Sequence, residues 1–278
     1  MKGLKEMTDV KVLDDNELES LIDYVDNHLH LSNDLPEEFT YNNPALIIVD
    51  AILSKNRDYD KAKVWIKNFK NNYKGINSLN DLEKVIESEG AIKVTEEIKY
   101  KDVSRIIEIK EVAETFLDLK LKYNERDDLK AMKKWAEETD FTKKDDPIFK
   151  IKGIGIATFQ YLRILSGAQT CKPDIHIKNF LNNVLDRKKG KKFSEESAVR
   201  AVTQLAESID KDTRLLDNAI WKYQRSKNDI KKVTVEDMMY YIDFLDKEKL
   251  VEVQEYVKNE MKKRWFGKSS LFLLCLNI

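Results

Sequence analysis

The stretch that decides the fold is IFKIKGIGIATFQYLRILSGAQTCKPDIHIKNFL, residues 148–181. It places Gly153 and Gly155 one residue apart in a chain with only 8 glycines among 278 residues. Glycine permits positive φ and lets the backbone approach another group closely. The spacing therefore predicts a tight hairpin between two helices, with backbone N–H groups exposed at the start of the second helix, 156–166.

The N–H groups at such a helix start are suited to bind phosphate, because the peptide dipoles point toward an anion. The same Gly-x-Gly turn also arises where two helices simply pack closely, so the glycines alone leave both interpretations open. Gly167 ends the second helix, and Asp174 stands just before a further one. Asp174 is therefore either the N-cap of that helix or a functional carboxylate.

The composition favours helices along the whole chain. There are only 4 prolines, 36% of the residues are charged, and apolar residues recur at three- and four-residue spacing. We expect an all-α protein. Asn43 and Pro44 predict a helix start, as cap and first helical position, and Ser78 is the predicted cap of another helix, whereas residues 91–99 are either helical or strand-like. The 2 cysteines exclude a four-cysteine metal site within this chain, and His28 and His30 have no third ligand at metal spacing. We expect no metal and no cofactor.

The charges balance, since 49 basic and 50 acidic residues give a net charge of −1. No overall positive field indicates a nucleic-acid partner, so any such binding must come from local patches. The lysine-rich stretches at 143–144, 188–192 and 262–264 are either phosphate contacts or solvated faces. No segment approaches the roughly 18 apolar residues that span a bilayer, and the first residues lack the apolar region of a signal peptide. We expect a cytoplasmic protein without a membrane partner, associated with the nucleoid if its source is a prokaryote.

Residues 151–181 resemble the signature of the base-excision DNA glycosylases of the endonuclease III superfamily, which consists of a helix-hairpin-helix, a Gly/Pro-rich loop and an aspartate. Two further stretches resemble the family's early central helix and its late helix: NPALIIVDAILSKNRDYDKA (43–62) and DKDTRLLDNAIWKYQ (210–224). The resemblance covers residues 16–224 in the family's order and is strongest over 152–180. It implies that Gly153 and Gly155 hold a DNA phosphate and that Asp174 is the catalytic carboxylate.

The resemblance also implies an architecture of two helical lobes that flank a DNA-binding cleft. Residues 41–166 form the central lobe, which includes the hairpin. Residues 1–40 and 167–227 form the second lobe. Residues 228–278 match nothing in the family and are predicted to be a helical extension of unknown role. We expect a monomer.

Two departures from the family pattern narrow the reaction. Bifunctional members carry a lysine two positions beyond the second hairpin glycine, where this chain has Ala157, and the family's four-cysteine iron–sulfur pattern is missing. The resemblance therefore implies a monofunctional glycosylase that hydrolyses the N-glycosidic bond of a flipped, damaged or mismatched base in double-stranded DNA, without lyase activity. Two alternatives are a non-catalytic DNA-binding module of the same fold and an unrelated helical interaction protein.

Cleavage of an N-glycosidic bond builds positive charge on the sugar, and a carboxylate such as Asp174 can stabilise that charge and deprotonate a water molecule. The base must first leave the stack, which needs a wedge for the gap and a pocket for the base. The polar run at Asn56 and Arg57 is the predicted wedge. Trp65, Trp135 and Trp221 are either pocket or core residues. The full set of predicted DNA-binding residues is Gly153, Gly155, Lys150, Lys152, Asn56, Arg57 and Lys178, with His176 and Tyr59 in support.

Overall fold

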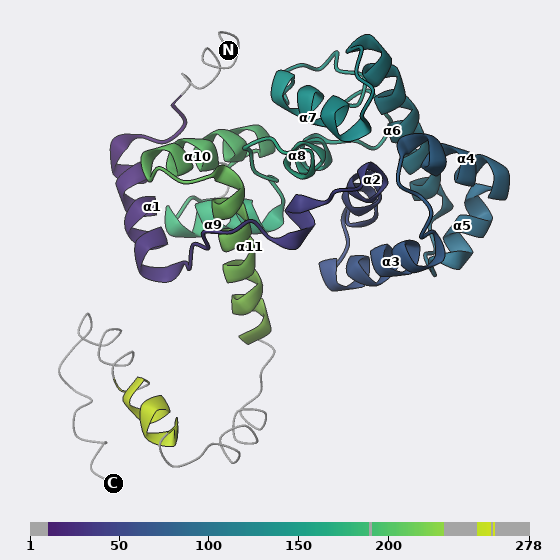
Figure 1. Cartoon of the computed structure of the whole chain (residues 1–278). Coiled ribbons are helices and arrows are strands. Elements are labelled where there is room, and N and C mark those ends of the chain that lie inside the picture. The colour runs from purple at the N-terminus through teal and green to yellow at the C-terminus, as the bar shows by residue number, and fades with distance from the viewer. Residues whose placement is uncertain (1–10, 189–190, 231–248, 257, 259–278) are drawn as a thin grey trace. The chain divides into compact units, whose positions relative to one another are not determined.

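The computed structural model describes residues 11–188, 191–230, 249–256 and 258 (Figure 1). The chain divides into two compact units, Met1–Arg225 and Ser226–Ile278. In the second unit, residues 249–256 are helical. Most of the predicted extension 228–278 lies outside the described residues, as do the lysine-rich stretch at 262–264 and residues 189–190 of the stretch at 188–192.

All regular secondary structure among the described residues is helical, which confirms the expected all-α class. The first half of the chain forms α1 (Asp15–His28), the 3-10 helix η1 (Glu37–Thr40), α2 (Pro44–Leu53), α3 (Tyr59–Asn72), α4 (Leu79–Glu89), α5 (Ala91–Glu97) and α6 (Val103–Lys122). The second half forms α7 (Asp128–Glu138), α8 (Ile156–Leu165), α9 (Ile175–Val184), α10 (Glu195–Ser208) and α11 (Thr213–Ile230). None of the helices in the described ranges combines the length and the apolar character that crossing a membrane requires.

Side-chain caps explain where several helices begin. The Asn43 side chain accepts a hydrogen bond from the N–H of Leu46 at 3.1 Å, and Pro44 occupies the first position of α2, as predicted. The Ser78 hydroxyl accepts from the N–H of Asp81 at 3.1 Å at the start of α4, which confirms the second predicted cap. These polar side chains satisfy N–H groups that the first helical turn leaves without partners.

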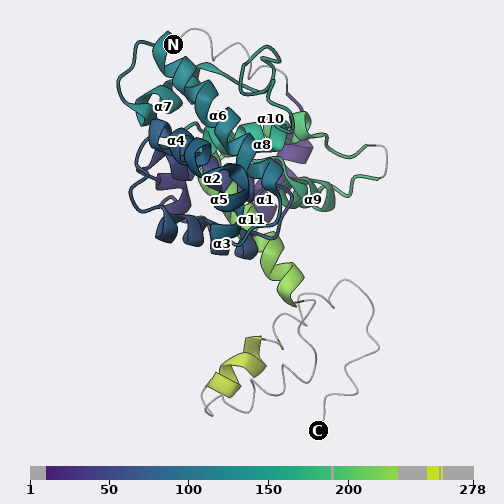
Figure 2. The same ribbon diagram turned by 90° about the vertical axis from the view of Figure 1, so that its right-hand side faces the viewer.

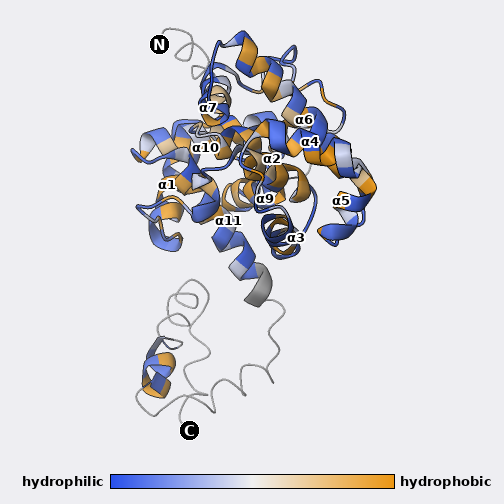
Figure 3. Ribbon diagram, turned by 45° about the vertical axis from the view of Figure 1, so that its right-hand side comes forward, coloured by the Kyte–Doolittle hydropathy of each residue, from blue (hydrophilic) through white to orange (hydrophobic). Residues whose placement is uncertain are grey.

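The centre of the first unit is α2, whose residues are all buried. It packs against α3, α6 and α8, and Figure 2 shows it surrounded by these helices. Figure 3 shows the hydrophobic colour along most of α2, whereas the outer helices alternate between hydrophobic and hydrophilic faces. A helix that is apolar nearly all round is stable only when neighbours cover every side, so its sequence explains its central position.

The helices of the first unit pack in two groups (Figure 1). One group contains α2 to α8, and the other contains α1, α9 and α10. Helix α8 also contacts α10 and so joins the groups. Helix α11 has side-chain contacts with both, because the Trp221 ring packs edge-on against Tyr59 of α3 and the Tyr223 ring against Tyr24 of α1.

Candidate active site

The glycine turn, residues 151–155, lies directly before α8. Gly153 has φ +95°, a conformation that side chains of L-residues rarely adopt, and Gly155 is the N-cap of α8 with φ −91°. Both glycines are exposed, and no side chain caps α8. A cap without a side chain leaves the first N–H groups of the helix accessible to an outside acceptor.

A chain of turns, rather than an α-helix, precedes the glycine turn, since α7 ends at Glu138. Asp146 holds this connection in place. Its carboxylate accepts hydrogen bonds from the Trp135 indole at 3.0 Å, the Thr139 hydroxyl at 2.7 Å and the Ile148 N–H at 2.9 Å. Because Pro147 follows, Asp146 is also disfavoured in the helical conformation.

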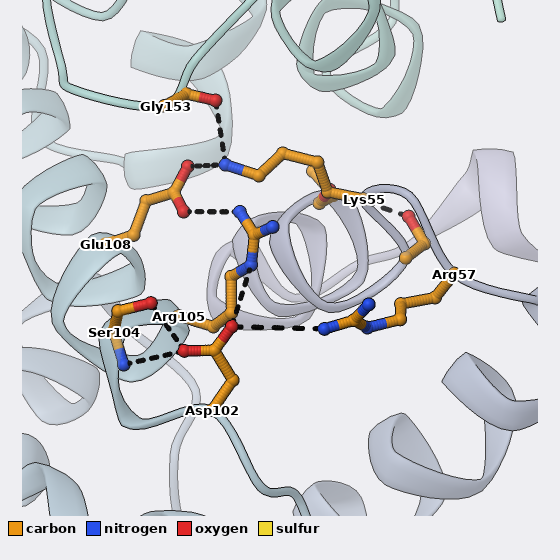
Figure 4. Close-up of polar contacts among 9 residues, drawn as sticks. Lys55, Arg57, Asp102, Ser104, Arg105, Glu108 and Gly153 are labelled. Atoms are coloured by element: carbon orange, nitrogen blue, oxygen red, sulfur yellow. Dashed lines mark hydrogen bonds and ion pairs between the residues drawn. The ribbon is translucent and has the colours of Figure 1, made fainter.

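A buried ion pair supports the glycine turn from below (Figure 4). Lys55, just beyond the end of α2, donates to the Gly153 carbonyl at 2.8 Å and pairs with Glu108 of α6. Both charged side chains are only 8% exposed. Arg105 donates to the other Glu108 oxygen at 2.9 Å, so the buried carboxylate has cations on both oxygens. The turn is therefore fixed to the two central helices α2 and α6.

The predicted wedge residues lie beside this network (Figure 4). Asn56 has φ +56° in the tight turn between α2 and α3, and both Asn56 and Arg57 are exposed. The Arg57 guanidinium lies 3.9 Å from a carboxylate oxygen of Asp102, and Arg105 contacts the same oxygen at 3.7 Å. The ion-pair network thus places the wedge residues and the glycine turn on neighbouring loops.

Asp174 is the N-cap of α9, so that interpretation of the sequence is confirmed. Its Oδ1 accepts from the N–H groups of His176 at 2.8 Å and Ile177 at 3.2 Å. The side chain is partly exposed. Within the described residues its Oδ2 accepts no hydrogen bond. The backbone of α9 therefore orients the carboxylate and leaves one oxygen available to a ligand.

Asp50, in the middle of α2, is a site residue that the sequence did not reveal. It is fully buried and accepts hydrogen bonds from the hydroxyls of Tyr41 at 3.0 Å, Tyr59 at 3.1 Å and Tyr161 at 3.2 Å. Burial raises the pKa of Asp50 to about 6, against the effect of the tyrosine hydrogen bonds and of the nearby Lys172 charge. A lone aspartate inside an apolar helix was the available signal, but one of its partners, Tyr161, lies 111 residues away in the chain.

The loop before Asp174 is held by a second buried carboxyl, Asp217 of α11. Asp217 accepts from the Lys172 N–H at 2.8 Å. Burial and the neighbouring Asp174 charge raise the pKa of Asp217 to about 8. Near neutral pH, Asp217 is therefore mostly protonated.

An aromatic group lies next to these carboxyls. The centre of the Trp221 ring lies 5.6 Å from the ring centre of Tyr59 and 6.4 Å from that of His176. The Arg225 guanidinium carbon lies 4.7 Å from the centre of the Trp221 ring. Trp135 is a core residue instead, 1% exposed and packed between Phe116 and Phe159. The structure thus brings Tyr59, His176 and Trp221 together.

The remaining predicted contacts are spread over the surface. Lys150 and Lys152 are exposed and flank the first glycine. Lys178 is partly buried and lies 3.9 Å from Glu195. The central helices connect these parts, since α2 carries Asp50 and ends next to Lys55, while α8 begins at the glycine turn and carries Tyr161.

A group of acidic residues with metal-ligand spacing occurs away from this site. In the part of the chain that the structure describes, the ligand atoms of Glu83, Glu87 and Glu114 lie within 4.8 Å of one another. The Lys110 ammonium already pairs with Glu87 at 2.9 Å and with Glu114 at 3.2 Å. Because the Lys110 ammonium already binds two of the three carboxylates, we assign the group no metal.

The comparison with known families covers the whole candidate site. A family model described as "Domain of unknown function (DUF8548)" matches residues 19–225. The chain belongs to this family. No curated protein and no solved structure matches the chain. The matched range ends at Arg225, where the first compact unit also ends, and it contains the glycine turn, Asp50, Asp174 and Asp217.

Proposed function

We propose that this protein is a monofunctional DNA glycosylase that hydrolyses the N-glycosidic bond of a damaged or mismatched base extruded from double-stranded DNA. The observation that carries the proposal is the geometry of Asp174. Its carboxylate is fixed by two backbone N–H groups, is partly exposed, and has one oxygen without a partner among the described residues. This arrangement suits a group that must face a developing positive charge.

The proposed reaction has one catalytic residue. When the bond between the sugar carbon and the base nitrogen breaks, the electron pair leaves with the base and the sugar becomes oxocarbenium-like. Asp174 stabilises that cation and accepts a proton from the water molecule that adds to the sugar carbon. Ala157 stands in the first turn of α8 and cannot form an imine with the sugar, so the product is an intact abasic site.

The DNA contacts of the proposal follow from the loops around the site. The glycine turn and the uncapped start of α8 bind a phosphate, although no α-helix directly precedes the turn, and the exposed Lys150 and Lys152 add positive charge. Asn56 or Arg57 fills the gap left by the extruded base. The packing of the helices in two groups, joined by the contact of α8 with α10, supports the proposed two-lobed architecture.

Base release from a panel of modified duplexes tests the proposal. We expect wild-type protein to release at least one base under single-turnover conditions and Asp174→Asn to release it at least about 100-fold more slowly. Duplex binding by the variant should be unchanged, because asparagine can also cap α9. Equal rates for the two proteins would remove Asp174 from the reaction.

The second candidate function is a DNA-binding module without turnover. The observation that favours it is the structural role of Asp174, because a helix cap alone would account for an aspartate at this position. Salt-dependent duplex binding by the wild-type protein without release of any base would support this module. Absence of duplex binding would contradict both functions. A protein–DNA adduct trapped by borohydride would contradict the hydrolytic reaction.

A further inference from the structure

Lys172 presents an ammonium group beside the catalytic aspartate. Its Nζ lies 3.9 Å from the centre of the Tyr161 ring, and the side chain is partly exposed. Among residues 11–188 and 191–230, the ammonium has no hydrogen-bond partner and no carboxylate within 4.0 Å. A lysine carries three N–H donors, so this one can bind a ligand without breaking a contact within the described protein.

The segment 172–174 is held rigidly. The Lys172 N–H donates to Asp217, the Asp174 N–H donates to the Lys172 carbonyl at 2.7 Å, and Pro173 fixes the backbone between them. The side chain of Asp174 is held as well, because it accepts hydrogen bonds from backbone N–H groups as the cap of α9. An ammonium and a carboxylate are therefore presented two residues apart, with the ammonium over the Tyr161 ring.

Two buried carboxyls lie near Lys172 without forming an ion pair with it. The buried carboxylate of Asp50 acts on the Lys172 charge from the side of α2, and Asp217 acts on it from α11. Neither forms a direct ion pair with it in the described structure. The exposed Lys150 and Lys152 have no such aromatic and carboxyl surroundings in the glycine turn. Lys172 thus differs from Lys150 and Lys152, the predicted phosphate contacts, because an aromatic ring and two buried carboxyls lie near it.

We propose that Lys172 is a catalytic residue of the glycosylase, binding the departing base and stabilising the negative charge that develops on it. This inference rests on the proposed function and names the class of base that the site accepts, which is a base that is neutral before cleavage. A base that already carries a positive charge would be repelled by the Lys172 ammonium over the Tyr161 ring. Lys63 and Arg225, which lie over Tyr59 and Trp221, both pair with Asp60 instead.

Lys172 and Asp174 each stabilise one of the two opposite charges that develop in the reaction, on the base and on the sugar. The bond from the sugar carbon to the base nitrogen breaks, and its electron pair stays on the base, whose negative charge Lys172 offsets. Water adds to the sugar carbon and loses its proton to Asp174. The base anion takes up one proton, so water is the only co-reactant. Opposite charges fixed at the two ends of a breaking bond act most strongly in the transition state.

Single-turnover base release by the full-length protein tests the inference, with duplexes that contain uracil, 5-fluorouracil, hypoxanthine or 7-methylguanine. The first three bases leave as anions, 5-fluorouracil most easily, whereas 7-methylguanine leaves as a neutral molecule because its nucleoside is a cation. We expect Lys172→Met to slow release of uracil and hypoxanthine about 100-fold, release of 5-fluorouracil less, and release of 7-methylguanine least. Lys172→Arg, which keeps the charge, should recover part of the rate.

The matched control is Lys134→Met, since Lys134 is also a partly buried lysine over a tyrosine ring, 5.0 Å from the centre of Tyr123, but on α7. It should leave all four rates unchanged. An equal loss by Lys172→Met on every base that the wild type releases would overturn the inference, because a merely structural lysine affects all bases alike. Release of 7-methylguanine alone by the wild type would also overturn it. Absence of any release by the wild type would instead refute the proposed glycosylase itself.

Discussion

Asp217 and Asp50 are buried carboxyls from two different helices, and both act on Lys172. Asp217 lies on α11 and Asp50 on α2, and burial is the main cause of the raised pKa of each. A carboxyl whose pKa is higher in the folded chain than in the unfolded chain binds more protons when folded. The stabilisation that it contributes is complete below the unfolded pKa of about 4 and is lost as the pH rises toward the folded pKa.

The pH dependence of unfolding should therefore change in Asp217→Asn. Because the folded pKa of Asp217 is about 8, the wild-type free energy of unfolding should fall relative to that of the variant between pH 5 and pH 8. The slope of this difference can reach about 1.4 kcal/mol per pH unit for a single group. Urea unfolding of both proteins at three pH values in this range measures the difference in their free energies of unfolding. A difference that stays constant from pH 5 to pH 8 would show that Asp217 does not hold a proton in the folded protein.

At the residue scale, the sequence predicted the positions that depend on neighbours in the chain. Asp174 could be assigned to a helix start because Ile175 to Leu181 follow it with helical spacing. The three tyrosines around Asp50 could not be predicted, since Tyr161 lies 111 residues away from it. Hydrogen bonds between distant residues depend on how helices pack, and a local sequence pattern does not predict that packing.

At the scale of elements, the glycine turn is supported by the loop after α2. The two glycines differ in what a side chain would meet. A Cβ on Gly153 would lie 3.1 Å from the Lys55 ammonium and would have to adopt φ +95°, whereas a Cβ on Gly155 would meet nothing within 4 Å. The protein itself thus requires glycine only at position 153. Gly155 is an ordinary N-cap residue with open space around it.

The two alanine substitutions should separate stability from DNA binding. Gly153→Ala should lower the free energy of unfolding by about 1–2 kcal/mol, because of the positive φ and the contact with Lys55. Gly155→Ala should change stability less than Gly153→Ala, because the new methyl group meets nothing within 4 Å and the lost N-cap preference offsets the reduced entropy of the unfolded chain. It should still weaken duplex binding, since the methyl group stands between the N–H groups of α8 and a phosphate. Thermal unfolding and fluorescence anisotropy measure the two effects. Wild-type duplex affinity in Gly155→Ala would mean that the turn does not approach DNA.

Helix starts were the elements that the sequence predicted best, because Asn43 and Ser78 cap the helices that follow them directly. The connection 139–155 was predicted less well, since a helix was expected before the glycines. Its conformation depends on Asp146, which binds Trp135 and Thr139 of the preceding segment. Residues 91–97, which could have been a strand, are helical as α5 and pack against α4 and α6.

At the scale of the whole molecule, the net charge of −1 gives no overall positive field, so the proposed DNA binding depends on a local surface. The exposed Lys150 and Lys152 lie on one loop, beside the predicted wedge loop that carries Arg57. Each lysine that contacts a phosphate releases a counterion, so duplex affinity should fall as the salt concentration rises. This distribution of charge could be predicted from the sequence only as a set of candidate patches.

Removal of one of these lysines should reduce the salt dependence of duplex affinity. In Lys152→Ala, the slope of log affinity against log salt should become shallower by about 1. Lys122→Ala is the control, because Lys122 lies 14 positions beyond Glu108 on α6, about 21 Å along the helix from the glycine turn. Titrations at four salt concentrations give the slopes. Equal slopes for Lys152→Ala and the wild type would place the phosphate contacts elsewhere.

The central claim is that the Asp174 carboxylate faces the sugar of an extruded nucleotide, and the affinity for a cationic abasic-site analogue tests it without knowledge of the base. The measurement compares a duplex that contains a pyrrolidine abasic analogue, which is positively charged like the transition state, with one that contains the neutral tetrahydrofuran analogue. We expect the wild type to bind the cationic duplex about 100-fold more tightly than the neutral duplex, or tighter still. Asp174→Asn should lose this preference and keep its affinity for the neutral duplex. Equal affinity of the wild type for the two duplexes would contradict the central claim.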